Sequence, residues 1–185
     1  MDMLRLILFA HVAATIGIFA ALTIEWVGLK HLSQATSYEQ AREWARLWRL
    51  LAPLGIPSVL VVLLSGIYMA TTLGVWNFAW TRVAFPTLVI VAIAARVAEP
   101  RRRRLMSAIA TNTGPLPPSF LRDLKQPLFL ASLRLRAALL LGLVFEMTVR
   151  PDPGGAVVMG GFVLAGVFWA ITTGRGLSSA AIGET

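Results

Sequence analysis

The amino-acid sequence predicts an all-α integral membrane protein, a polytopic bundle of about five spanning helices in a single domain over residues 1–185. Two observations carry this prediction. The chain is 57% hydrophobic with a mean hydropathy of +0.72, and only 14% of its residues are charged, against about 25% in a typical soluble domain. Its apolar residues are also gathered in segments of roughly 20 residues, the length that an α-helix needs to cross a bilayer.

Five segments have this length, and they lie at about residues 4–29, 50–73, 79–97, 128–149 and 155–174. The first is too long, and its start too poor in positive charge, for a signal peptide, so we expect it to stay as a helix. The third is short and the fifth is rich in glycine, which leaves four spans as an alternative. The chain has no cysteine, which excludes disulfides, iron–sulfur clusters and thiol catalysis.

The segment before the second span reads TSYEQAREWARLWRLL. Thr36 and Glu39 have the spacing of a helix capping box. Trp44, Leu47 and Trp48 then follow at the i, i+3, i+4 spacing of one helix face. This pattern predicts an amphipathic helix at the membrane interface that leads into the second span. The alternative is one long second span that emerges from the bilayer.

Basic residues gather in two of the four connections between the segments. They are Lys30, Arg42, Arg46 and Arg49 in the first connection, and Arg101, Arg102, Arg103, Arg104, Arg122 and Lys125 in the third. The other two connections hold only Arg150. Because Lys and Arg are retained on the cytoplasmic side, we expect the N-terminus outside and the C-terminus inside, with a cytoplasmic basic loop at 98–127.

The run Arg101–Arg104 is a cluster of the kind found in proteins that bind nucleic acid. Directly after a span, we interpret it instead as a topology determinant that contacts anionic lipid headgroups, where each basic residue contributes about 1 kcal/mol. We therefore expect the lipid bilayer as a partner and no nucleic acid.

Ionisable side chains occur inside the predicted spans, where a charge is costly enough to mark a functional candidate by default. In the outer half of the bundle these are His11, Arg82 and Glu146. On each of their helices a second polar residue lies on a similar face further along, given a rotation of about 100° per residue. We predict an outer Arg82–Glu146 pair with His11 beside it.

The inner half contains Glu25, Arg96 and Arg136. We predict that Glu25 pairs with Arg136 or with Arg96 as a buried ion pair. The alternative is that the arginines extend to the headgroups, since long basic side chains near helix ends reach water easily.

Methionine supplies a further observation, because most of the methionines fall on the outer side. These are Met1, Met3, Met69, Met147 and Met159. Thioether and imidazole groups together suit Cu(I), and His with Met can also hold a haem iron. The candidate ligands are therefore His11 and Met69, joined by Met147 and Met159. The alternative is that these methionines only fill gaps in apolar packing.

His11, early in a first span rich in small residues, and the segment PSVLVVLLSGIYMA at 57–70 resemble a group of small bacterial inner-membrane proteins. The group includes the copper-resistance protein D family, the membrane-bound protoporphyrinogen oxidase family and related integral membrane proteins, and the resemblance covers about residues 1–95. It implies a helical bundle in the bacterial inner membrane with His11 facing a haem, porphyrin or copper site.

The leading functional hypothesis is a membrane protein that handles a haem, porphyrin or copper ligand in its outer half. His11 and Met69 are the expected ligands, with Arg82 and Glu146 as charged neighbours. A second hypothesis is a non-enzymatic subunit or scaffold, bound to a partner subunit or to a second copy, whose buried ion pairs only fix helix packing. A third is a small transporter or channel, with a polar path past Glu25 and Arg136. No pattern identifies a catalytic residue.

Overall fold

A computed structural model describes residues 2–51, 54–124, 127–151 and 154–180. These residues form seven α-helices and one short 3₁₀ helix, with no strand among them. The elements are α1 (Met3–Leu32), α2 (Tyr38–Leu51), α3 (Gly55–Thr72), η2 (Val75–Asn77), α4 (Ala79–Thr111), α5 (Pro118–Leu124), α6 (Pro127–Val149) and α7 (Gly155–Ala180). The prediction of an all-α protein is confirmed.

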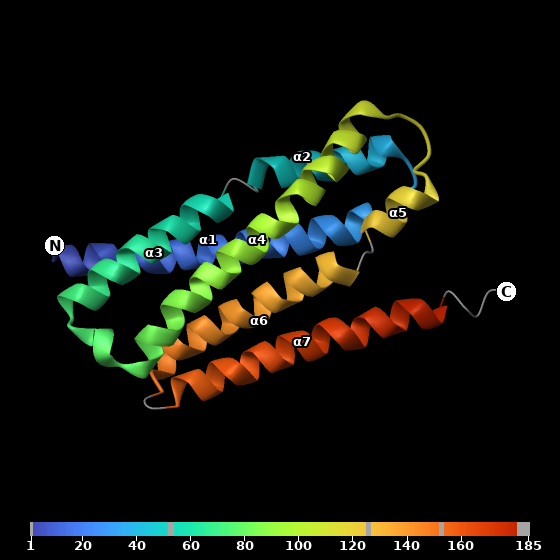
Figure 1. Cartoon of the computed structure of the whole chain (residues 1–185). Helices are drawn as coiled ribbons and strands as arrows, with labels where there is room; N and C mark the ends of the chain where they lie inside the picture. The colour runs from blue at the N-terminus through green and yellow to red at the C-terminus, as the bar shows by residue number, and fades with distance from the viewer. Residues whose placement is uncertain (1, 52–53, 125–126, 152–153, 181–185) are drawn as a thin grey trace.

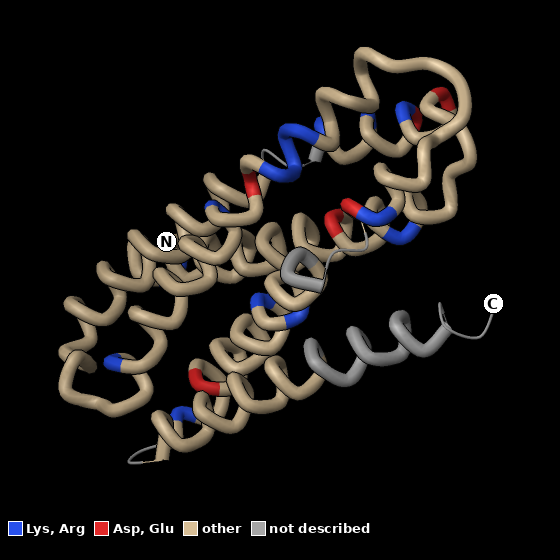
Figure 2. Tube along the Cα trace, turned by 45° about the vertical axis from the view of Figure 1, so that its right-hand side comes forward, with Lys and Arg blue, Asp and Glu red and all other residues tan. Residues whose placement is uncertain are grey.

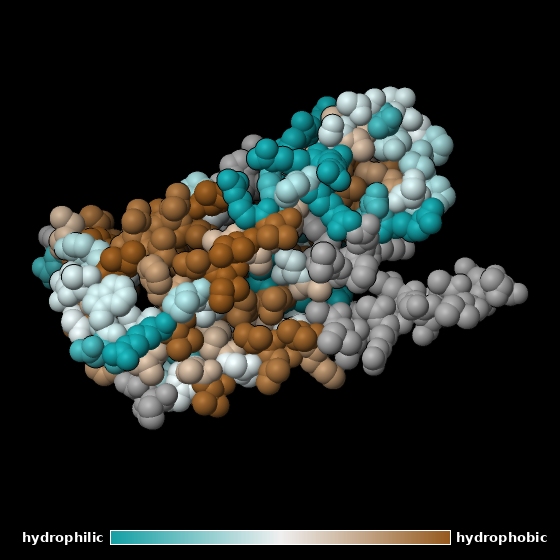
Figure 3. Space-filling model, in the orientation of Figure 1, coloured by the Kyte–Doolittle hydropathy of each residue, from teal (hydrophilic) through white to brown (hydrophobic). Residues whose placement is uncertain are grey.

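The five long helices lie side by side along one axis, and α2 and α5 cover one end of the bundle (Figure 1). The main neighbours are α6 with α7, α1 with α3, and α4 with α6. Charged residues gather at the end that carries α2, α5 and the second half of α4 (Figure 2). A brown apolar band covers the middle of the bundle, next to the teal surface of that charged end (Figure 3).

Three of the described helices, α1, α3 and α4, are long and apolar enough to cross a membrane. This supports a membrane protein with spanning helices. In α7 the apolar stretch among the described side chains is shorter, at Gly155–Trp169. In α6 the apolar sequence is interrupted by Arg134, Arg136 and Glu146.

The amphipathic segment and the second span are separate helices, because α2 ends before α3 begins at Gly55. The alternative of one long second span is therefore wrong. Trp48 is buried on the inner face of α2, in an apolar cluster with Leu32 of α1 and with Leu105 and Ile109 of α4. This packing holds α2 against the two long helices.

The expected loop at 98–127 is wrong for most of its length, because α4 continues to Thr111 and α5 follows. Two interactions extend α4. Glu99 accepts charged hydrogen bonds from Arg102 and Arg103 one turn later, and such i, i+3 and i, i+4 pairs stabilise a helix. Leu105 and Ile109 also bury their side chains against α2.

The prediction that Thr36 and Glu39 form a capping box is wrong. Ser37 Oγ, one residue beyond Thr36, accepts the backbone N–H of Gln40 at 3.3 Å. Glu39 instead accepts the backbone N–H of Gly114 at 3.0 Å, from the turn after α4. The start of α2 is thus held to a segment 75 residues away in sequence, which no local pattern could indicate.

Candidate functional site

His11 lies in the interior of the bundle and is only 6% exposed. Its Nδ1 is 2.8 Å from Ser65 Oγ on α3. The Ser65 hydroxyl donates to the carbonyl oxygen of Val61 in its own helix. Which of the two groups donates depends on the tautomer of the imidazole. In the tautomer with its proton on Nδ1, the lone pair is on Nε2, the form in which imidazole binds a metal.

His11 lines a cavity of about 280 Å³, which we call the histidine cavity. Its walls come from α1, α3, α4, α6 and the turn around η2. Met69 of α3 and Met147 of α6 also line it. The Oγ1 of Thr81, another lining residue, is buried and has no hydrogen-bond partner in the described part of the chain. The histidine cavity thus brings an imidazole, two thioethers and an unpaired hydroxyl to one space.

Met159 does not take part in this cavity. It is 5% exposed and belongs to the apolar core. A Cβ placed on Gly142 would lie 3.0 Å from its Sδ, so its sulfur fills the space above that glycine. The packing alternative therefore applies to Met159, and the ligand prediction for this residue is not supported by its position.

The predicted Arg82–Glu146 pair is wrong. Arg82 is exposed, and its Nε donates to the carbonyl oxygen of Trp76 at 3.3 Å. A second guanidinium nitrogen reaches Asn77 Oδ1 at 3.5 Å. The physical reason is local, because Arg82 in the first turn of α4 reaches acceptors of η2 directly before its own helix.

Glu146 is completely buried, and its two carboxylate oxygens have no hydrogen-bond partner among the described residues. A Cβ placed on Gly155 would lie 2.8 Å from Glu146 Oε2 and 3.3 Å from the backbone nitrogen of Trp80. The carboxylate therefore lies against the first turns of α7 and α4, where helix dipoles favour negative charge. In the sequence, this position of the carboxylate is indicated by Gly155 at the start of the last span, because a glycine leaves room for the Glu146 side chain.

The inner ion pair is confirmed in one of its two predicted forms. A guanidinium nitrogen of Arg136 on α6 lies 2.9 Å from Glu25 Oε1 on α1, and both side chains are largely buried. The other form, with Arg96, is wrong, because Arg96 is exposed and has no ion pair or hydrogen bond to another described residue. Arg96 also lines the seam between α3 and α4.

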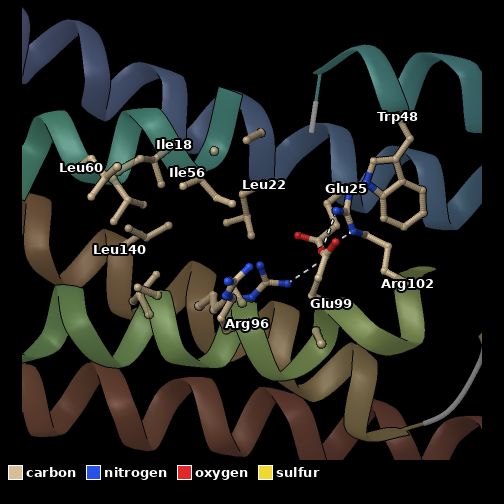
Figure 4. Close-up of a pocket in the computed structure, with 18 residues that line it drawn as sticks. Ile18, Leu22, Glu25, Trp48, Ile56, Leu60, Arg96, Glu99, Arg102 and Leu140 are labelled. Atoms are coloured by element: carbon tan, nitrogen blue, oxygen red, sulfur yellow. Dashed lines mark hydrogen bonds and ion pairs between the residues drawn. The ribbon is translucent and has the colours of Figure 1, made fainter. Parts of the chain in front are cut away.

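Glu25 and Arg136 line a second cavity of about 410 Å³, which we call the arginine pocket. Apolar side chains, among them Ile18, Leu60 and Leu140, occupy one end of it (Figure 4). The other end carries charged residues and an aromatic ring: Glu25, Arg96, Glu99, Arg102, Arg136 and Trp48. The arginine pocket is therefore amphipathic along its length.

The two cavities share no lining residue. Along α1, the buried apolar residues Ala14 and Ile18 separate His11 from Glu25. Val62 and Leu139 add to this layer from the neighbouring helices. The continuous polar path expected for a transporter is therefore closed in this conformation.

Within the described residues, no group of three or more His, Cys, Asp or Glu side chains is placed to hold a metal ion. A metal in the histidine cavity would therefore depend on thioether sulfur. Comparisons with protein-family models, with curated proteins and with solved structures give no match to this chain.

Proposed function

We propose that this protein is a membrane-embedded copper-binding protein that holds one Cu(I) ion in the histidine cavity. The ligands would be Nε2 of His11 and the sulfur atoms of Met69 and Met147. The observation that carries this proposal is that one imidazole and two thioethers, from three different helices, line the same space. Thioether and imidazole are donors that suit Cu(I).

The size of the cavity favours a metal ion over a haem or a porphyrin. Organic ligands usually occupy pockets of roughly 300–1,000 Å³, and the histidine cavity, at about 280 Å³, lies below that range. Glu146 directly precedes the lining residue Met147 but does not itself line the cavity, so its carboxylate is not among the proposed ligands.

The membrane arrangement that fits this function has five spans, formed by α1, α3, α4, α6 and α7, in the bacterial inner membrane. For α6, the charges need not face lipid, because Arg136 is paired with Glu25 and Glu146 is buried. The exposed residues of α6 include Leu141 and Val144. With the N-terminus outside, as the positive-inside rule requires, the histidine cavity lies in the outer half.

Copper binding is tested by anaerobic competition with a chromophoric Cu(I) chelator, on the full chain in mild detergent. We expect one Cu(I) per chain, and an affinity lowered by about tenfold or more in His11→Ala and Met69→Leu, which corresponds to at least about 1.4 kcal/mol. Leu keeps the volume of Met but removes the sulfur. Met159→Leu is the matched control, and it should bind copper as the unmodified chain does.

Two results would contradict the proposal: an unmodified chain that binds no copper, or a Met159→Leu loss equal to that of Met69→Leu. A Soret band in the absorption spectrum, lost in His11→Ala, would assign the cavity to haem instead.

The second candidate is a structural subunit, and two contacts favour it. The His11–Ser65 hydrogen bond joins α1 to α3, and the Glu25–Arg136 pair joins α1 to α6. Under this alternative the chain binds neither copper nor haem, and it co-purifies with a partner subunit or with a second copy. His11→Ala would then lower stability without any change in metal content.

A further inference from the structure

The charges of the arginine pocket do not cancel. Arg136 is neutralised by Glu25 at 2.9 Å, and Arg102 by Glu99 at 2.6 Å. Arg96 lines the same pocket and, among the described residues, has no acidic or hydrogen-bonding partner. The guanidinium of Arg96 is therefore available to pair with one anionic group. Arginine suits phosphate, because its planar donors bind two oxygens at once.

An apolar groove of about 470 Å³ runs along the seam between α3 and α4 and adjoins the pocket. Its lining residues are Val59, Leu63, Leu88, Val89, Ala92, Ile93, Arg96 and Val97. All of these except Arg96 are apolar. The stretch of α4 from Leu88 to Arg96 is about 12 Å long, at 1.5 Å per residue.

Arg96 stands where the pocket and the groove meet. Val59, Ala92 and Arg96 line both. In Figure 4, Arg96 lies between the apolar end of the pocket and the end that carries Glu99 and Arg102. The combined space therefore offers a cation at its centre and a hydrocarbon-lined channel that leads from it along the outside of the bundle.

We infer that this space binds one anionic phospholipid, whose phosphate pairs with Arg96 and whose acyl chain lies in the groove between α3 and α4. The groove opens on the side of the bundle where Ile93 and Val97 are exposed, so a bilayer lipid can enter it laterally. Arg96 is also less than two turns before Arg101–Arg104, the run that we assign to headgroup depth. A phosphate at that depth is within reach of Arg96.

The test is native mass spectrometry of the delipidated full chain in mild detergent, titrated with phosphatidylglycerol or with phosphatidylcholine. We expect one phosphatidylglycerol per chain, bound more tightly than phosphatidylcholine. Arg96→Gln should weaken it by about tenfold or more, as expected for one lost charge-assisted hydrogen bond. Arg122→Gln, at an exposed arginine of α5 that lines neither the pocket nor the groove, is the matched control and should bind the lipid unchanged.

The acyl chain is tested separately. Ala92→Phe should fill the junction of pocket and groove and weaken phosphatidylglycerol binding, whereas Ala110→Phe, at an exposed position of α4, should not. Glycerol 3-phosphate, which has the phosphate without a tail, should not displace the lipid at equal concentration.

Three outcomes overturn the inference: Arg96→Gln binds the lipid like the unmodified chain, Arg122→Gln loses it equally, or glycerol 3-phosphate competes as well as the lipid. Since Arg96 is exposed and unpaired in the described structure, its substitution should leave the far-ultraviolet circular dichroism unchanged, and this measurement accompanies each titration. The groove shares Leu63 and Leu88 with the histidine cavity, but Arg96 does not line that cavity, so the effect of Arg96→Gln on lipid binding is separate from the copper result.

Discussion

His11 and Glu146 are both buried and ionisable, yet their surroundings give them different roles. His11 has a hydrogen-bond partner at Nδ1 and a cavity beside it, so the imidazole is held in one orientation. Glu146 has no hydrogen-bond partner in the described chain and lies against two helix starts. Residue type alone could not have distinguished these two surroundings.

Glu39, outside the spans, predicts a pH dependence of stability. The backbone N–H of Gly114, then its own backbone N–H and Ser37, lower the pKa of this carboxyl below the ordinary value for glutamate. A lowered folded-state pKa contributes stability that is present above the unfolded value and lost as pH falls through the folded value. We expect Glu39→Gln to unfold more easily than the unmodified chain near neutral pH, and the difference to vanish in acid.

Thermal unfolding followed by circular dichroism from about pH 7 to about pH 3 measures this difference across the window in which the carboxyl titrates. Glu43→Gln is the control, since Glu43 is exposed on the same helix and does not contact Gly114. A difference that stays constant down to the lowest pH would refute the role given to Glu39.

At the scale of the helices, the Glu25–Arg136 pair is the polar contact that joins α1 to α6. Both side chains are largely buried, at 14% and 8% exposure. Removing one partner of a buried pair leaves an uncompensated charge, whereas replacing both partners together is often close to neutral. The pair therefore sets how the two helices meet, and it need not raise stability over an apolar contact.

A double-substitution series tests this role. We expect Arg136→Met to destabilise the protein by about 3–5 kcal/mol, because Glu25 stays buried and unpaired. Glu25→Gln combined with Arg136→Met should recover most of that loss. The free energy of unfolding in mixed detergent and denaturant gives both values. If the two substitutions were simply additive, the carboxylate and the guanidinium would not act as a pair.

At the scale of the whole molecule, charge and apolar surface divide the bundle along its long axis. The charged end carries α2, α5 and the extension of α4, while apolar side chains cover the middle (Figure 3). In the proposed five-span arrangement, the two ends of the chain would fall on opposite sides of the bilayer. The rule that Lys and Arg are retained in the cytoplasm then predicts that the charged end faces the cytoplasm.

The absence of cysteine from the sequence makes this topology directly testable. Single cysteines introduced at Met3 and at Thr113, both exposed positions, provide one thiol at each end of the bundle. In intact bacterial cells, a membrane-impermeant maleimide should label Met3→Cys and not Thr113→Cys. Labelling of Thr113→Cys should appear only after the cells are lysed. The reverse pattern would place the charged end outside.

The sequence alone determined the helical class, the apolar segments that became α1, α3 and α4, and the amphipathic helix before α3, because length, hydropathy and helical period are local properties. For Glu25, depth in the membrane limited the possible ion-pair partners to two, Arg136 and Arg96.

Only the tertiary structure decided the rest. Arg82 pairs with the turn before its own helix, Arg96 faces the seam with α3, and Met159 fills space above Gly142. The helical period states which residues share a face of one helix, but the rotation of each helix about its axis follows from the packing of all of them together. For the same reason, α4 extends past residue 98: its continuation is stabilised by apolar contacts with α2, far away in the sequence.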